Sequence, residues 1–122
     1  MVILFVIGIN YGKDAIRKAE LEDIKTDMLS IKSRAKIIVD EYNYEDIDDL
    51  KGVEIEDQEL LSKLEIEEGY IWDRETLDEE GLNAIDANKY AVSYNLDDPN
   101  DTEVYYIDGY DGAYSLTAIQ EK

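Results

Sequence analysis

The chain has 122 residues, of which 12 are basic, 31 are acidic and none is histidine or cysteine, so its formal net charge at pH 7 is −19. This length suits one small domain, and a hydrophobic content of 44% is too high for a disordered chain. The negative charge argues against a nucleic-acid partner, because phosphate binding is driven by lysine and arginine. The absence of cysteine and histidine excludes disulfides, thiolate metal sites and a serine–histidine–aspartate triad.

The first nine residues, Met1 to Ile9, are all apolar or small. A helix that crosses a bilayer needs roughly 20 apolar residues, about twice this length. The segment also lacks the basic region and the cleavage site of a secretory signal. Two interpretations remain open, namely a buried strand or helix start, and the remaining part of a membrane anchor.

A long helix is predicted from Lys13 to about Tyr42, because this stretch contains no glycine or proline. Its apolar residues are spaced alternately by three and four positions and therefore share one face: Leu21, Ile24, Met28, Ile31, Ala35, Ile38 and Tyr42. Such a stripe forms either a coiled-coil seam or the face of a helix that lies on a sheet. Leu29, Ile37 and Val39 widen the stripe, which favours the sheet.

Short helices are predicted in the middle of the chain. Ile47 and Leu50 indicate one helical turn that ends at Gly52, and residues 60–64 indicate another helix that ends before Gly69. A short strand follows at residues 70–73.

A third helical turn is predicted directly after that strand. Asp73 is a suitable N-cap, Thr76 and Glu79 resemble a capping-box pair, and Gly81 can end the turn.

The C-terminal part reads as an antiparallel sheet. Tyr90, Val92 and Tyr94 alternate in one strand, and a second strand follows at residues 102–107 after an acidic, turn-rich loop. Residues 108–112 are predicted to turn, and residues 113–119 to add an edge strand or close the chain. The expected fold class is α+β, a long N-terminal helix packed on a small C-terminal antiparallel sheet.

Charge divides the chain into two parts. Residues 1–42 carry seven basic and seven acidic residues, whereas residues 43–122 carry five basic and twenty-four acidic residues. We therefore expect an N-terminal helical part over 1–42 and an acidic globular head over 43–122.

Several stretches resemble the type IV pilin and type II secretion pseudopilin superfamily, and more closely the pilin-like proteins of Gram-positive, clostridia-type bacteria. "MVILFVIGI" is similar to the second half of the apolar pilin segment, and residues 19–43 resemble the amphipathic half of the pilin helix, with its K-x-D-M-x-x-I-x-S phrase. "YIWDRETLDEEGLNAI", "KYAVSYNLDDPNDTEVYYIDGY" and "YSLTAI" look like the end of such globular heads.

The resemblance implies a structural subunit that assembles with copies of itself and with other pilin-like subunits. The expected location is the cell surface, with the membrane reached through the N-terminal segment, or the cytoplasm if the chain starts at Met1. Pilin precursors carry a basic leader, a processing glycine and a glutamate at the fifth mature position, and none of these occurs in residues 1–9. We therefore expect the first half of the pilin segment to be missing. The stretch "NYGKDA" is also expected to interrupt the apolar run. The helix-to-sheet and subunit contacts would use Leu21, Ile24, Met28, Ile31, Ala35 and Ile38.

One acidic loop is a candidate calcium site. Calcium prefers oxygen ligands on a tight loop, and Asp97, Asp98, Asn100 and Asp101 supply them, although not with the EF-hand spacing. Major pseudopilins hold calcium in a loop of this region, so the resemblance adds support. Asp108, Gly109, Asp111 and Gly112 are a weaker candidate, and both stretches also suit ordinary polar turns.

No enzyme motif is present. The chain has no P-loop, GxGxxG or HExxH motif, and chance carboxylate pairs do not make a glycosidase. We expect a non-enzymatic protein without an assured cofactor. The alternative to a filament subunit is a soluble acidic interaction module, either a DNA mimic or a coiled-coil dimer.

Overall fold

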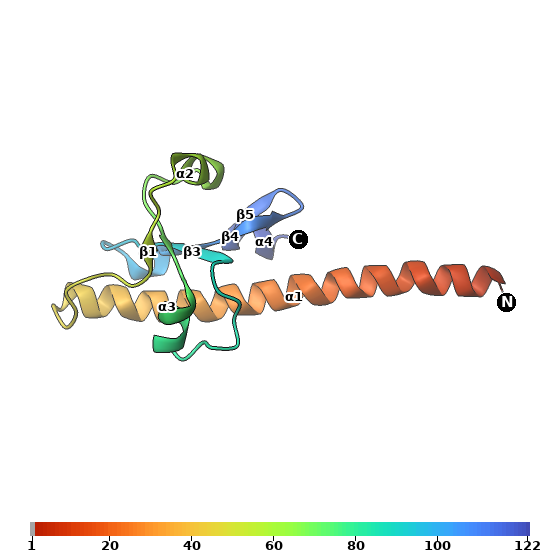
Figure 1. Ribbon diagram of the computed structural model, residues 1–122, viewed down its shortest axis with the longest axis horizontal. Helices are drawn as coiled ribbons and strands as arrows, with labels where there is room; N and C mark the ends of the chain where they lie inside the picture. The colour runs from red at the N-terminus through yellow and green to blue at the C-terminus, as the bar shows by residue number, and fades with distance from the viewer. Residues whose placement is uncertain (1) are drawn as a thin grey trace.

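A single long helix dominates the computed structural model, which describes the backbone of residues 2–122 and the side chains of residues 18–122. Helix α1 runs over Val2–Asn43 without a break, so it begins earlier than the expected Lys13. The stretch "NYGKDA" interrupts the apolar run of the sequence, but the helix continues through it. The strand interpretation of Val2–Ile9 is therefore wrong, whereas Met1 lies outside the described residues. Figure 1 shows that the N-terminal part of α1 extends well beyond the rest of the chain.

Five short strands form one antiparallel sheet in the order β1-β2-β3-β4-β5. They are β1 (Val53–Glu54), β2 (Tyr70–Ile71), β3 (Tyr90–Ser93), β4 (Glu103–Tyr110) and β5 (Ala113–Ser115). The predicted hairpin is confirmed as β3 and β4, in which Tyr90 lies opposite Tyr106 and Val92 opposite Val104. Together with α1, this sheet confirms the predicted α+β class.

The remaining helices are short: α2 (Gln58–Leu64), α3 (Arg74–Glu79), the 3-10 turn η1 (Pro99–Asp101) and α4 (Leu116–Gln120). The helices expected near residue 60 and after Asp73 are confirmed. The helical turn expected around Ile47 and Leu50 is wrong, because residues 44–52 form turns and bends after α1.

The ends of α3 and β5 also differ from the sequence patterns. The Asp73 carboxylate accepts hydrogen bonds from Thr76 N at 3.0 Å and Thr76 Oγ1 at 2.7 Å, so Thr76 partners the N-cap rather than Glu79. Strand β5 ends at Ser115, whose hydroxyl accepts from the Ala118 amide and thereby starts α4.

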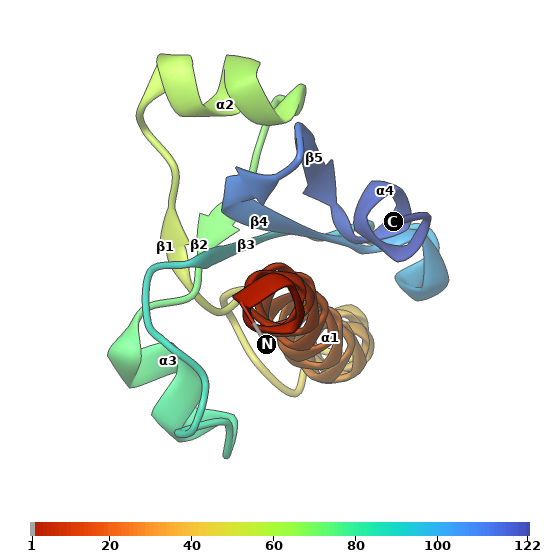
Figure 2. The ribbon, with the colours of Figure 1, turned by 90° about the vertical axis from the view of Figure 1, so that its right-hand side faces the viewer.

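The sheet has a helix on each face. Figure 2, which looks along α1, shows α1 beneath one face of the sheet and α2 on the opposite face. The larger core lies between α1 and the sheet and contains Trp72, Leu77, Val92, Val104, Leu116 and Ile119, all at most 2% exposed. A smaller cluster beneath α2 contains Ile55, Leu61, Leu64 and Ala91.

The tyrosines of the sheet divide between these two faces, as strand alternation requires. Tyr90 and Tyr106 belong to the α1 side and their rings lie 5.5 Å apart, whereas Tyr105 and Tyr114 belong to the α2 side. Tyr90 and Tyr106 therefore point toward α1, on the side of the sheet where the pocket described below lies.

Candidate functional site

The predicted apolar stripe of α1 is buried in the core between α1 and the sheet. Met28, Ile31, Ala35 and Ile38 are at most 1% exposed, Leu21 is 9% exposed, and Ile24 packs partly buried against the same core. The expected helix-to-sheet contact is thus present. A side chain that the sheet of its own chain covers cannot also contact a neighbour, so subunit contacts would need other residues of α1.

The opposite side of α1 faces away from the head. Thr26, Leu29, Ser33 and Ile37 are exposed there, with Leu29 and Ile37 at 47% and 43%. Between Glu22 and Asp40, this outer side carries no charged residue. It is an uncharged strip on a protein in which 35% of the residues are charged.

From residue 18 onward, the lysines of α1 lie on one side of this strip, and most of its acidic residues, together with Arg34, lie on the other. Seven-residue spacing places Lys18, Lys25 and Lys32 in one row, with Lys36 one turn after Lys32. We call these four residues the lysine flank. Nearly half a turn away around the helix lie Glu20, Asp23, Asp27 and Glu41, which we call the acidic flank.

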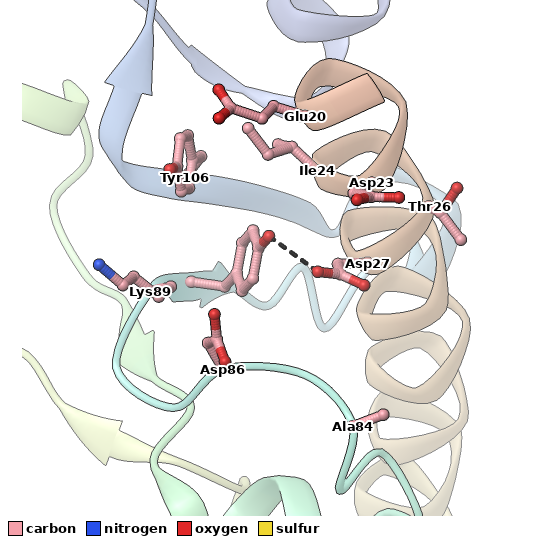
Figure 3. A pocket seen from close by; sticks show the side chains of 10 residues that line it. Glu20, Asp23, Ile24, Thr26, Asp27, Ala84, Asp86, Lys89 and Tyr106 are labelled. Carbon is pink, nitrogen blue, oxygen red and sulfur yellow. Dashed lines mark hydrogen bonds between the residues drawn. The ribbon is translucent and has the colours of Figure 1, made fainter. Parts of the chain in front are cut away.

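The acidic flank borders a pocket of about 590 Å³ between α1 and the head. Figure 3 shows Glu20, Asp23 and Asp27 from α1 on one side and Tyr106 and Lys89 on the other, with Asp86 from the segment before β3. The Lys89 ammonium is bound 3.2 Å from the Asp108 carboxylate. The four carboxylates that line the pocket thus outnumber its one lysine, which is itself paired with Asp108.

A hydrogen bond ties the acidic flank to the sheet. The Tyr90 hydroxyl donates to Asp27 Oδ2 over 3.2 Å, and Tyr90 is only 4% exposed. Burial raises the pKa of Asp27, the bond from Tyr90 opposes this, and the nearby Asp23 and Asp86 carboxylates raise the pKa further. Burial, followed by the Asp27 charge, raises the pKa of Tyr90, so this phenol stays protonated as a donor.

Sequence reasoning did not identify this pocket. Asp23 and Asp27 stand four residues apart on a helix, which is a signal that two carboxylates share one side. Asp86 and Tyr90 come from a segment some sixty residues later, and no local pattern brings them to α1.

The proposed calcium loop forms a 3-10 turn whose side chains bond to its own backbone. Asn95 Oδ1 accepts from the amides of Asp97 and Asp98, and Asp98 Oδ1 accepts from the Asn100 amide over 3.0 Å. Asp101 is exposed at the end of η1. These bonds are those of a capped polar turn.

The second candidate loop is the turn between β4 and β5. Gly109 has a φ of +76°, and an added Cβ would lie 2.5 Å from the Tyr114 ring, so glycine is required there for both backbone and space. The Asp108 carboxylate is bound to Lys89 at 3.2 Å. Among the residues that the structure describes, no group of three or more acidic side chains is arranged to hold a metal ion.

Calcium binding by the 97–101 loop stays a prediction with a direct measurement. If calcium is held, millimolar calcium (roughly the affinity range of extracellular modules) should raise the melting temperature, and chelator should reverse the rise. An Asp98→Ala variant is the control, and an unchanged melting temperature for the native chain would mean that the loop is only a turn.

A long N-terminal helix packed on an antiparallel sheet is an arrangement consistent with a pilin-like fold. Comparison with family models, curated proteins and solved structures found no match to this chain. Within the described part of the chain, none of the helices combines the length and the apolar character that crossing a bilayer requires.

Proposed function

We propose that the chain is a non-enzymatic structural subunit of a pilin-like or pseudopilin-like filament, displayed at the cell surface or in a secretion machine. The observation that carries this proposal is the length of α1. Its C-terminal half packs on the sheet, while the rest of its 42 residues extends beyond the head and starts with the apolar run Val2–Ile9. A helical segment that extends beyond the head is available for contacts with other subunits.

Two further features support assembly through the helix. Leu29 and Ile37 extend apolar surface along the outer side of α1, although the inner side is fully used by the sheet. The head carries the excess negative charge, which keeps it solvated while the charge-balanced helix meets other subunits. The membrane would be reached through the N-terminal segment.

The test is direct imaging of the full chain. Electron microscopy of the purified protein, alone and with detergent diluted away, should show filaments. An Ile7→Asp variant should form none, because a buried charge in a helix core is strongly unfavourable. The matched control is Leu96→Asp, which places the same charge on an exposed loop of the head and should leave the filaments intact.

Thermal melting of the head should be the same in all three proteins, since residue 7 belongs to the N-terminal part of α1, which extends beyond the head. A native chain that stays monomeric in every condition would contradict the proposal. If that monomer also bound a basic nucleic-acid-binding protein, the soluble acidic interaction module would be the better description.

A further inference from the structure

Most of the lysine flank has no ion pair among the side chains that the structure describes. Of the lysine flank, only Lys25 has an ion pair within residues 18–122, with Glu22 at 3.7 Å. Lys18 is exposed, and Lys32 and Lys36 are half-exposed. Four of the nine lysines of the chain thus lie in one row on an otherwise strongly acidic protein.

The acidic flank, in turn, has few basic side chains beside it. Asp23, Glu20 and Asp86 are exposed around the pocket, and Asp27 is half-exposed. The one arginine on this side of α1, Arg34, lies 3.6 Å from Glu80, and Lys89 is held by Asp108. Apart from Lys89, which is paired with Asp108, the charged and aromatic lining of the pocket consists of four carboxylates and two tyrosine rings, which suits an ammonium group.

We propose that the lysine flank of one copy docks against the acidic flank and the Asp86 pocket of a second copy, with the two α1 helices side by side and parallel. This inference rests on the proposed function and names the contact that the filament would repeat. The occupant of the pocket is a lysine side chain from the neighbouring copy.

Charge complementarity selects the orientation. When two copies stand parallel with their heads on the same side, the lysine flank of one meets the acidic flank of the next. If the neighbour is antiparallel and its head stays on that side, lysine flank meets lysine flank and acidic flank meets acidic flank. Both contacts are repulsive. Lys18 and Lys25 also stand at the same level along α1 as Glu20 and Asp27, so no large axial shift is needed.

The contact uses two different surfaces and is therefore heterologous. Each copy keeps a free lysine flank at one side and a free acidic flank at the other, so the contact propagates instead of closing into a two-fold dimer. This property is what an open filament needs and what a closed dimer lacks.

Charge-reversal variants of the full chain test the contact. Lys18→Glu with Lys32→Glu reverses the lysine flank, and Asp23→Lys with Asp86→Lys reverses the acidic side. The controls make the same charge changes outside both flanks: Lys51→Glu with Lys63→Glu, and Glu56→Lys with Glu67→Lys. Lys63 lies in α2, Glu56 and Glu67 lie just before and after it, and Lys51 faces Glu79 of α3. Sedimentation velocity at low salt measures the fraction of protein in species larger than the monomer.

Each flank variant should weaken self-association at least about tenfold, while the controls should leave it close to that of the native chain. An equimolar mixture of the two flank variants should restore association. One variant then has two acidic flanks and the other has two basic flanks, so the two can alternate along an assembly. Raising the salt to about 0.3 M should weaken association of the native chain, since exposed charges are screened.

The outcomes separate this inference from the proposed function. Filaments or oligomers of the native chain that survive both reversals would overturn the flank contact and leave the filament proposal standing. Salt-sensitive oligomers that respond to the reversals, but persist in Ile7→Asp and never form filaments, would support the flank contact and contradict the filament proposal. Far-UV circular dichroism and melting temperatures show that each variant is folded.

Discussion

At the scale of single residues, the most consequential polar group in the core is the Tyr94 hydroxyl. It donates to the Lys51 carbonyl over 2.6 Å and accepts from Trp72 Nε1 over 3.1 Å. Trp72 is fully buried, and its indole N–H group needs a partner. One hydroxyl thereby joins the turn after α1 to the middle of the sheet.

We expect Tyr94→Phe to lower the free energy of unfolding by about 1–3 kcal/mol, because two buried groups lose their hydrogen-bond partner while the ring is kept. Urea denaturation measures this change. Tyr44→Phe is the matched control, since Tyr44 is 78% exposed and should have no measurable effect. An equal effect of the two substitutions would show that the hydroxyl network does not stabilise the fold.

The carboxyl of Asp27 makes stability depend on pH. Its pKa is raised above the ordinary value of 3.8, mainly by burial. Above the raised pKa, the folded protein holds an unfavourable charge, and this penalty is relieved as the pH falls through the raised value toward 3.8.

Asp27→Asn keeps an oxygen acceptor for Tyr90 and removes the charge. We expect the variant to be more stable than the native chain at pH 7 by a few tenths of a kcal/mol, since solvent screens this half-exposed site. The difference should shrink toward zero below the ordinary carboxyl pKa, where the native Asp27 is protonated as well. Urea denaturation of both proteins at several pH values measures it, and a pH-independent difference would contradict the assignment.

At the scale of elements, α1 has two sides with different roles. Its inner side is buried in the head, whereas its outer side and flanks are open. Neighbouring positions can therefore have very different importance, as Met28 and Leu29 do with exposures of 0% and 47%.

We expect Met28→Ala to destabilise the head by about 2–5 kcal/mol, because it leaves a cavity between α1 and the sheet. Leu29→Ala should change the free energy of unfolding by less than about 0.5 kcal/mol. Thermal and urea unfolding of both variants measure the contrast. Comparable losses would mean that the outer side of α1 is also packed in the isolated protein.

At the scale of the whole molecule, net charge opposes folding. The head contains all of the unbalanced charge, and crowding twenty-four acidic residues onto it generates repulsion that salt can screen. Salt should therefore stabilise the fold, although it weakens the proposed contact between copies.

Raising the ionic strength from about 0.01 M to about 0.15 M shortens the Debye length from about 30 Å to about 8 Å. We expect the melting temperature of dilute protein to rise, by about 4–8 °C for each kcal/mol of repulsion relieved. The same change in salt near the sequence pI of 4.1 should have little effect, because the net charge is then small. A similar rise at both pH values would show that the stabilisation does not come from screening.

The fold could be predicted where a pattern repeats over several turns or residues. The three-four spacing from Leu21 to Tyr42 predicted α1. The alternation at Tyr90, Val92 and Tyr94 predicted strand β3, which packs on α1. Short signals were less reliable, since Ile47 and Leu50 suggested a helix where the chain only turns. Two apolar residues do not define a period.

The sequence by itself determined the α+β class, from the order of its helical and strand patterns, and the buried side of α1, from the period of a helix. Only the tertiary structure decided that Asp86 and Tyr90 meet Asp23 and Asp27 around one pocket. The physical reason is that local spacing sets which side chains share a face, whereas the packing of distant segments decides what lies opposite that face.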